Sequence, residues 1–125
     1  MPTLSEDRDA IRDVMARYCL FMDASRGDEF ASLFTEDASF DTRMGEPVVG
    51  RPALSALAEA MPAGAMHHMF TNLVIDVDGD QAVCDASAVV LSKGSIVMSA
   101  HTHDELQRVD GAWLITLRTF EPDPQ

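Results

Sequence analysis

Basic residues and long hydrophobic runs are both scarce in this 125-residue chain. Nine Lys and Arg stand against 21 Asp and Glu, which gives a formal net charge of −12. Binding to DNA or RNA requires Lys and Arg that neutralise phosphates, and anionic membranes attract a similar basic surface, so neither is an expected partner. No hydrophobic run is long enough to span a bilayer, and the sequence does not open on a charged segment followed by an apolar one. We therefore expect a cytoplasmic protein whose acidity serves solubility.

Cysteine and sequence repetition are also limited. The two cysteines, Cys19 and Cys84, form no C-x-x-C motif, so we interpret them as reduced thiols that pack as small hydrophobic side chains. The chain contains no low-complexity tail, internal repeat or domain linker. With 46% hydrophobic residues, it is expected to fold as a single domain over residues 1–125.

The N-terminal half has the hydrophobic spacing of α-helices. Thr3 and Glu6 have the spacing of a capping box, and apolar residues then recur at helical intervals, namely Ile11, Val14, Met15, Tyr18 and Met22. Gly27 is expected to end this helix. We expect next a short helix that begins near residue 28 and includes Phe34, a strand near residues 38–43, and a helix that starts at Pro52.

The C-terminal half is divided by three turn signals, which are Asp78-Gly79, Lys93-Gly94 and Asp110-Gly111. They predict strands over residues 66–77, 81–92, 95–109 and 112–121. Helices followed by such a meander indicate an α+β fold, with the helices on one face of a bent antiparallel sheet and a small-molecule pocket between them. The apolar residues of the first strand alternate out of phase with His68, so we expect a bulge or a twist there.

Asp23 and His68 are the candidate catalytic residues. Asp23 lies at the end of the first apolar helix, and His68 lies at the start of the first long strand. If both are buried, the carboxylate needs a hydrogen-bond donor and the imidazole needs a partner that orients it. Such a pair forms a side-chain base that works near neutral pH.

Several phrases occur in a characteristic order over nearly the whole chain. They are Tyr18-x-x-x-x-Asp23, Leu33-Phe34-Thr35-Glu36-Asp37-Ala38, Val49-Gly50-Arg51, His67-His68-x-x-Thr71-Asn72, Val77-Asp78-Gly79-Asp80, and the segment from Asp104 to Trp113. This order resembles the SnoaL-like group of the nuclear transport factor 2-like superfamily. The resemblance implies a cone-shaped barrel, made of a strongly bent antiparallel sheet with three N-terminal helices packed on it, and often a homodimer. Members include scytalone dehydratase, a hexachlorocyclohexane dehydrochlorinase, ketosteroid isomerase and polyketide cyclases, but others are non-catalytic, so fold alone does not decide function.

The resemblance places Asp23 and His68 where the dehydratase and the dehydrochlorinase carry an Asp–His dyad. The motif from His68 to Asn72 matches the dehydrochlorinase more closely. Two features of the dehydratase are missing: Met22 replaces a tyrosine before the aspartate, and the stretch from Val90 to Ser92 lacks a second histidine. A simpler elimination or isomerisation with one base is therefore the expectation.

Further residues are candidates for substrate binding: Tyr18, Met22, Asn72, Met98, Thr102 and Arg108. Tyr18 and Met22 precede Asp23 in the same helix, Asn72 lies four positions after His68, and the other three share the apolar register of the third long strand. Most have a structural alternative. Tyr18 can be a core aromatic, Asn72 can bind a neighbouring loop, Arg108 can lie at the surface, Asp23 can be a solvent-facing helix end, and His68 can be a core or sheet-edge histidine.

His101 and His103 share one face of a strand, and His67 could join them as a third metal ligand. Their register is opposite to the apolar one, so we place them on the outer face of the sheet, which often forms the dimer interface in the family that the chain resembles. We therefore expect neither metal nor cofactor, and a homodimer through this face.

Three functions follow from these observations. The first is a cofactor-independent lyase or isomerase, of elimination or dehydratase type, that uses the Asp23–His68 base on a small, apolar, cyclic substrate. The second is a polyketide cyclase or an epoxide-opening hydrolase with other acid–base groups. The third is a non-catalytic module for small-ligand binding or dimerisation.

Overall fold

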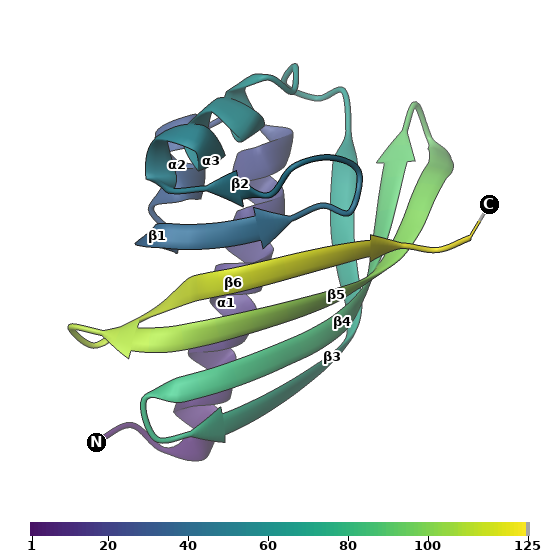
Figure 1. Ribbon diagram of the computed structural model, residues 1–125. Helices are drawn as coiled ribbons and strands as arrows, with labels where there is room; N and C mark the ends of the chain where they lie inside the picture. The colour runs from purple at the N-terminus through teal and green to yellow at the C-terminus, as the bar shows by residue number, and fades with distance from the viewer. Residues whose placement is uncertain (125) are drawn as a thin grey trace.

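The computed structural model describes residues 1–124, which form helices packed on one six-stranded sheet. The elements are, in order, α1 (Leu4–Asp23), α2 (Gly27–Ala31), β1 (Phe34–Asp41), β2 (Val48–Val49), α3 (Arg51–Glu59), β3 (His67–Asp78), β4 (Gln81–Ser92), β5 (Ser95–Val109) and β6 (Ala112–Pro122). Figure 1 shows α1 lying across one face of the sheet, with α2 and α3 next to β1 and β2. The predicted α+β class is confirmed.

The strand order of the sheet is β2-β1-β6-β5-β4-β3. All neighbouring strands are antiparallel except β1 and β6, which are parallel. The sheet is bent but not closed, so β2 and β3 are its two edges (Figure 1). The cone-shaped barrel that the resemblance implies is therefore an open, strongly bent sheet with the helices on one side.

Helix α1 begins as its sequence predicts. The backbone N–H of Glu6 donates to the Thr3 hydroxyl at 3.1 Å, and the backbone N–H of Thr3 donates to the Glu6 carboxylate at 3.2 Å, which completes the capping box. The buried face of α1 includes the apolar residues Ile11, Met15, Tyr18, Cys19 and Met22. The helix ends at Asp23, because Ser25 adopts a left-handed backbone conformation with φ +59°.

The next segment differs from the prediction. Helix α2 ends at Ala31, and Phe34, which we placed in the helix, is the first residue of β1. The reason is a long-range contact: Phe34 pairs with Ile115 of β6, and the register then shifts before Ser39. Gly27 begins α2 instead of merely ending α1. A β-carbon at Gly27 would lie 2.5 Å from the backbone carbonyl oxygen of Ser55 in α3, so only glycine lets the two helices approach this closely.

The predicted strands of the meander agree with the structure to within one residue at each end. Two of the three hairpins turn through a pair of left-handed residues, Lys93 and Gly94 in one and Asp110 and Gly111 in the other, as type I′ turns require. The predicted bulge in β3 is also confirmed, because its pairing with β4 shifts register between Thr71 and Val74.

The core lies between α1, α2, α3 and the concave face of the sheet. Its fully buried apolar side chains include Ile11, Met15, Phe30, Phe34, Leu54 and Ile115. None of the helices in residues 1–124 combines the length and the apolar composition needed to cross a membrane.

Candidate active site

Asp23 joins the end of α1 to the start of β3. Its backbone carbonyl accepts a hydrogen bond from the N–H of Gly64 at 3.0 Å. Its carboxylate oxygens accept from the backbone N–H of His68, at 3.2 and 3.0 Å. The sequence separates Asp23 and His68 by 45 positions, and the fold brings them into direct contact.

The side chains of Asp23 and His68 also bind each other. The distance from Asp23 Oδ1 to His68 Nδ1 is 2.5 Å, and the two side chains are only 18% and 16% exposed. When the carboxylate is ionised and the imidazole is neutral, Nδ1 donates its proton to Asp23 and Nε2 keeps a free lone pair. Asp23 is therefore not a solvent-facing helix end, and the geometry is that of an imidazole base held in one tautomer.

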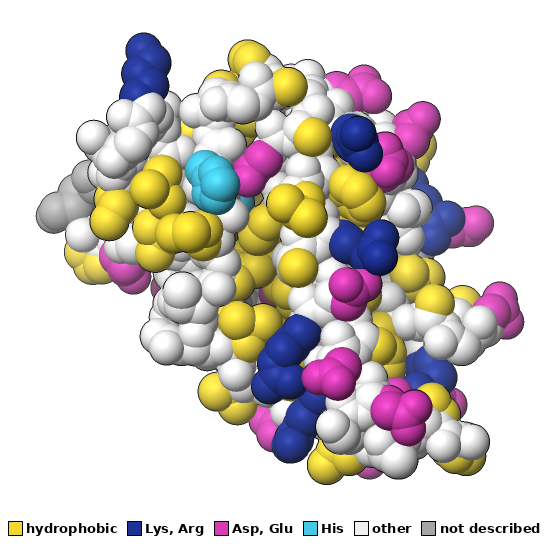
Figure 2. Space-filling model, turned by 180° about the vertical axis from the view of Figure 1, so that it is seen from behind, with side chains coloured by type: hydrophobic (Ala, Val, Ile, Leu, Met, Phe, Trp, Pro, Cys, Tyr) yellow, Lys and Arg dark blue, Asp and Glu magenta, His cyan; other side chains and the backbone are white. Residues whose placement is uncertain are grey.

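The imidazole of His68 lines a cavity of about 240 Å³ between α1, α3 and the sheet. Five methionines and four aromatic residues contribute to its wall, and few of its side chains are polar. The full lining is Tyr18, Met22, Phe40, Thr42, Met44, Leu57, Met61, Met66, His68, Phe70, Ala88, Val90, Met98, Arg118 and Phe120. Figure 2, which views the molecule from behind, shows that hydrophobic side chains are also exposed on the surface of this face, several of them beside a histidine.

A buried ion pair adjoins this cavity. Nη1 of Arg118 in β6 donates to Oδ2 of Asp104 in β5 at 2.6 Å, and the two side chains are 1% and 0% exposed. Arg118 lines the cavity, whereas Asp104 lies behind it. The sequence alone did not predict this pair. The sequence carried a signal for Asp104, which follows Met98 in the inward register of β5.

Aromatic rings surround the Arg118 guanidinium. Its central carbon lies 4.1 Å from the ring centroid of Tyr18, 4.8 Å from that of Phe70 and 5.4 Å from that of Phe40. Burial raises the pKa of Tyr18 to about 12, so its hydroxyl stays protonated at neutral pH. Burial also raises the pKa of Asp104, against the opposing effect of the Arg118 charge. The cavity thus contains one cation, held by a carboxylate that is itself removed from water.

Comparison with known proteins identifies the family. A family model described as a SnoaL-like domain matches residues 3–119. The chain belongs to the SnoaL-like domain family. No match is found among curated proteins.

Solved structures share this fold. A Mycobacterium tuberculosis protein of unknown function is 32% identical in sequence to this chain, with a TM-score of 0.87. The match covers 95% of this SnoaL-like chain and 73% of the Mycobacterium tuberculosis chain. A Catenulispora acidiphila protein in complex with S-DNPA is 26% identical with a TM-score of 0.81, over 93% and 92% of the two chains. A Streptomyces avermitilis protein of the NTF2-like family, for which a dehydratase activity has been suggested, is 15% identical with a TM-score of 0.84, over 98% and 100%, and shows the fold alone.

The predicted binding residues divide into two groups in this SnoaL-like domain. Tyr18, Met22 and Met98 line the cavity beside His68. Asn72 and Thr102 do not. Asn72 lies in the β3 bulge, with φ +55°, and is exposed. Thr102 is fully buried, and its hydroxyl donates to the carbonyl oxygen of Ala86 at 3.4 Å. A substrate in this cavity would therefore not contact these two side chains.

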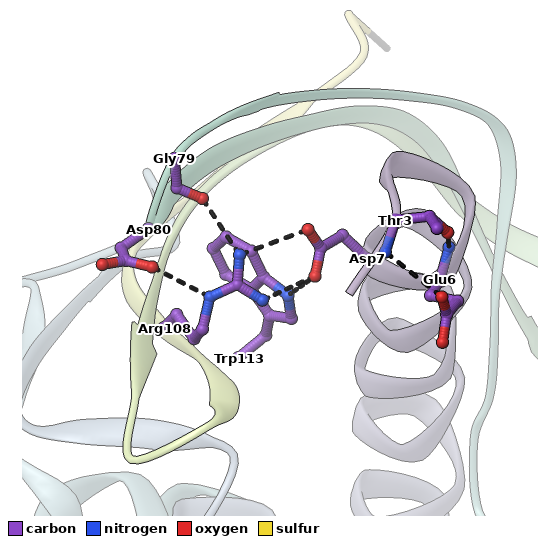
Figure 3. Close-up of polar contacts among 7 residues, drawn as sticks. All are labelled: Thr3, Glu6, Asp7, Gly79, Asp80, Arg108 and Trp113. Carbon is purple, nitrogen blue, oxygen red and sulfur yellow. Dashed lines mark hydrogen bonds and ion pairs between the residues drawn. The ribbon is translucent and has the colours of Figure 1, made fainter. Parts of the chain in front are cut away.

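Arg108, another of the candidates for substrate binding, also lies away from the cavity. Figure 3 shows it between the first turn of α1 and the β3–β4 turn. It donates to the Asp7 carboxylate at 2.6 and 3.2 Å, to the Asp80 carboxylate at 2.9 Å and to the Gly79 carbonyl at 3.1 Å. The Trp113 indole N–H donates to Asp7 at 3.1 Å, and Arg108 stacks on the Trp113 ring. These contacts tie α1 to the far end of the sheet.

The other histidines lie outside the cavity. His103 Nδ1 is 2.9 Å from Asp85 Oδ1, and His101 Nε2 is 3.4 Å from the same oxygen. These residues project from strands β4 and β5 away from the cavity, and His67 is exposed at the start of β3. Within residues 1–124, no group of three or more His, Cys, Asp or Glu side chains is arranged to bind a metal ion. The hydrogen bond to Asp85 raises the pKa of His103.

Proposed function

We propose that this SnoaL-like protein is a cofactor-independent lyase or isomerase that removes a proton from carbon in a small apolar substrate. The observation that carries the proposal is the contact between Asp23 and His68 at the wall of the apolar cavity. An imidazole with a fixed tautomer and a lone pair free to take a proton is the arrangement that general-base catalysis needs.

In the proposed step, Nε2 of His68 forms a bond to the substrate proton, and the electron pair of the broken C–H bond stays on the substrate. In an elimination this pair forms a C=C bond while a leaving group departs with its own bonding electrons. In an isomerisation the double bond moves, and the proton returns at another carbon. Asp23 stabilises the imidazolium in both cases, because its carboxylate is already hydrogen-bonded to Nδ1.

Arg118 is suited to stabilise the negative charge that develops as the proton leaves. It is the one Lys or Arg among the lining residues, and its side chain is 1% exposed. A positive charge acts more strongly in a water-poor site than at the surface, and one such group contributes typically 10²–10³-fold, about 3–4 kcal/mol, to the rate. General-base catalysis by His68 would add roughly 10²–10⁴-fold.

The third function that we considered, a non-catalytic ligand-binding module, has one observation in its favour. Val90 lines the cavity in the stretch where a scytalone-type dehydratase would carry its second histidine. Beyond His68, the lining therefore has no second imidazole to act as an acid. The structure of the Catenulispora acidiphila relative is a complex with S-DNPA, which is compatible with either function.

Deuterium incorporation tests the proposal without knowledge of the natural substrate. The protein would be incubated in D₂O with a panel of small cyclic enones, β-hydroxy ketones and vicinal halides, and ¹H NMR would detect exchange, double-bond migration or elimination. We expect catalysis with at least one class, a loss of at least 100-fold in His68→Ala and in Asp23→Asn, and native circular dichroism spectra for both variants. Undiminished catalysis in His68→Ala would disprove the proposal.

A further inference from the structure

We infer that Met44 is the outer contact of the bound substrate, so that the site prefers elongated apolar molecules over compact rings. This inference rests on the proposed use of the cavity as a substrate site. It adds the shape of the substrate and a residue that determines specificity.

The inner wall of the cavity, at the end that contains Arg118, is formed by side chains of helices and strands. Tyr18 and Met22 come from α1, Phe40 from β1, and Arg118 and Phe120 from β6, and all are buried. Neighbouring strands and packed aromatic rings hold these side chains in place. The inner wall therefore fixes the shape of the end of the cavity that contains Arg118.

Met44 belongs to a different kind of wall. It is 61% exposed, which makes it the one lining residue that is mostly accessible to solvent. It lies in the irregular segment of residues 42–47 between β1 and β2. Within the described chain, residues 43–46 form hydrogen bonds only to Asp41 and Thr42, at the base of the same segment. The segment therefore has no polar contact with the opposite wall that would prevent Met44 from moving onto a ligand.

The size of the cavity indicates what Met44 would contact. A dry apolar cavity of about 150 Å³ accepts benzene, whereas this cavity has about 240 Å³ before the mouth is covered. A single ring near Arg118 would leave the outer part unfilled. A molecule with an apolar chain or a second ring would reach the mouth and bury the exposed thioether of Met44. Methionine suits this position, because its unbranched side chain adapts to different ligands.

Two phenols that differ only in length test this inference by isothermal titration calorimetry. Phenol represents the compact ring, and 4-hexylphenol represents the elongated ligand. We expect the wild-type protein to bind 4-hexylphenol more tightly. We expect Met44→Ala to weaken 4-hexylphenol by about tenfold, because each buried methylene contributes about fourfold to affinity. Phenol should change by less than twofold, and Met44→Leu should retain most of the affinity for 4-hexylphenol.

Met69→Ala is the matched control. Met69 is also exposed, at 39%, but it does not line this cavity, so neither affinity should change. Three results would overturn the inference. Met44→Ala could lose affinity equally for both phenols, it could lose no affinity for 4-hexylphenol, or the wild-type protein could bind neither phenol. The outcome is separable from the proposed catalysis. If Met44→Ala weakens only the binding of 4-hexylphenol while His68→Ala still catalyses exchange, only the proposed function fails. If His68→Ala loses catalysis while Met44→Ala affects both phenols equally, only the role of Met44 fails.

Discussion

The buried pair of Arg118 and Asp104 offers a quantitative test of whether these charges serve the fold or the cavity. Asp104→Leu would leave a guanidinium that is 1% exposed without its carboxylate. Arginine does not lose its proton in proteins, and removing one partner of a buried ion pair costs about 3–5 kcal/mol, so we expect the free energy of unfolding to fall by about that amount. The double variant Asp104→Leu/Arg118→Met replaces both charged residues with apolar ones. Its free energy of unfolding should equal or exceed that of the wild type, because neither charge then has to be desolvated.

Arg118→Met alone should be less harmful than Asp104→Leu, for a reason that depends on pH. Burial already raises the pKa of Asp104, and without Arg118 the carboxyl can become neutral by binding a proton. A carboxyl whose pKa is raised in the folded state favours folding most at a pH below its ordinary value of about 3.9 and loses this contribution as the pH rises through the raised value. Arg118→Met should therefore be more stable at pH 5 than at pH 7, and Asp104→Leu should show no such gain.

Urea unfolding at pH 5 and pH 7, followed by circular dichroism, would measure these differences as shifts in midpoint. The double variant should also lose catalysis, or any ligand that the Arg118 charge holds, although it folds well. A double variant that is no more stable than Asp104→Leu would refute the reasoning, because the remaining loss would then come from packing and not from an unpaired charge. An Arg118→Met variant whose stability does not change between the two pH values would refute the protonation of Asp104.

Three further predictions concern other parts of the molecule. The hydrogen bonds from Arg108 lower the pKa of Asp7, so Asp7→Asn should lower the melting temperature at pH 7. In calorimetry, the difference in melting temperature between Asp7→Asn and wild type should shrink as the pH falls from about 5 to about 3. An ordinary carboxyl of pKa about 3.9, as in the unfolded chain, gains its proton in this range. Gly27→Ala should cost about 1–3 kcal/mol in chemical unfolding, because its β-carbon would meet a backbone carbonyl of α3 at 2.5 Å; an unchanged midpoint would contradict this close approach. The hydrogen bond to Asp85 raises the pKa of His103, so its NMR titration midpoint should lie above the ordinary value of about 6.5, and Asp85→Asn should lower it.

The parts of the fold that the sequence predicts well are those with local causes. The capping box at Thr3, the turns at Lys93-Gly94 and Asp110-Gly111, and the four strands that these turns divide depend on residues only a few positions apart. The start of β1 was wrong by four residues, because Phe34 is drawn into a strand by parallel pairing with Ile115, 81 positions away. No local pattern reports such a contact.

The same distinction applies to the site. Asp23 and His68 could be identified because each stands at the end of an apolar stretch and inside a family motif. Arg118 could not be placed from alternation alone, since the register between β5 and β6 shifts between Glu105 and Leu106. Arg108, the arginine that we chose instead, lies ten residues beyond Met98, the one residue of β5 that lines the cavity. The bulge thus decides whether Arg118 faces the cavity, and bulges depend on pairing partners that the sequence does not show.

The energetic character of the polar groups separates those that serve the fold from those that serve the site. Asp7 lies in the first turn of α1, where the positive end of the helix dipole favours a carboxylate. Asp23 is the last residue of the same helix, where the dipole disfavours one, and no basic residue of the last turn compensates it. Its carboxylate is held instead by hydrogen bonds from His68. Asp104 and Arg118 carry a desolvation cost that an apolar pair would avoid. The groups that are unfavourable for folding thus gather at one cavity, which supports the proposed use of this cavity, because proteins give up stability at functional sites.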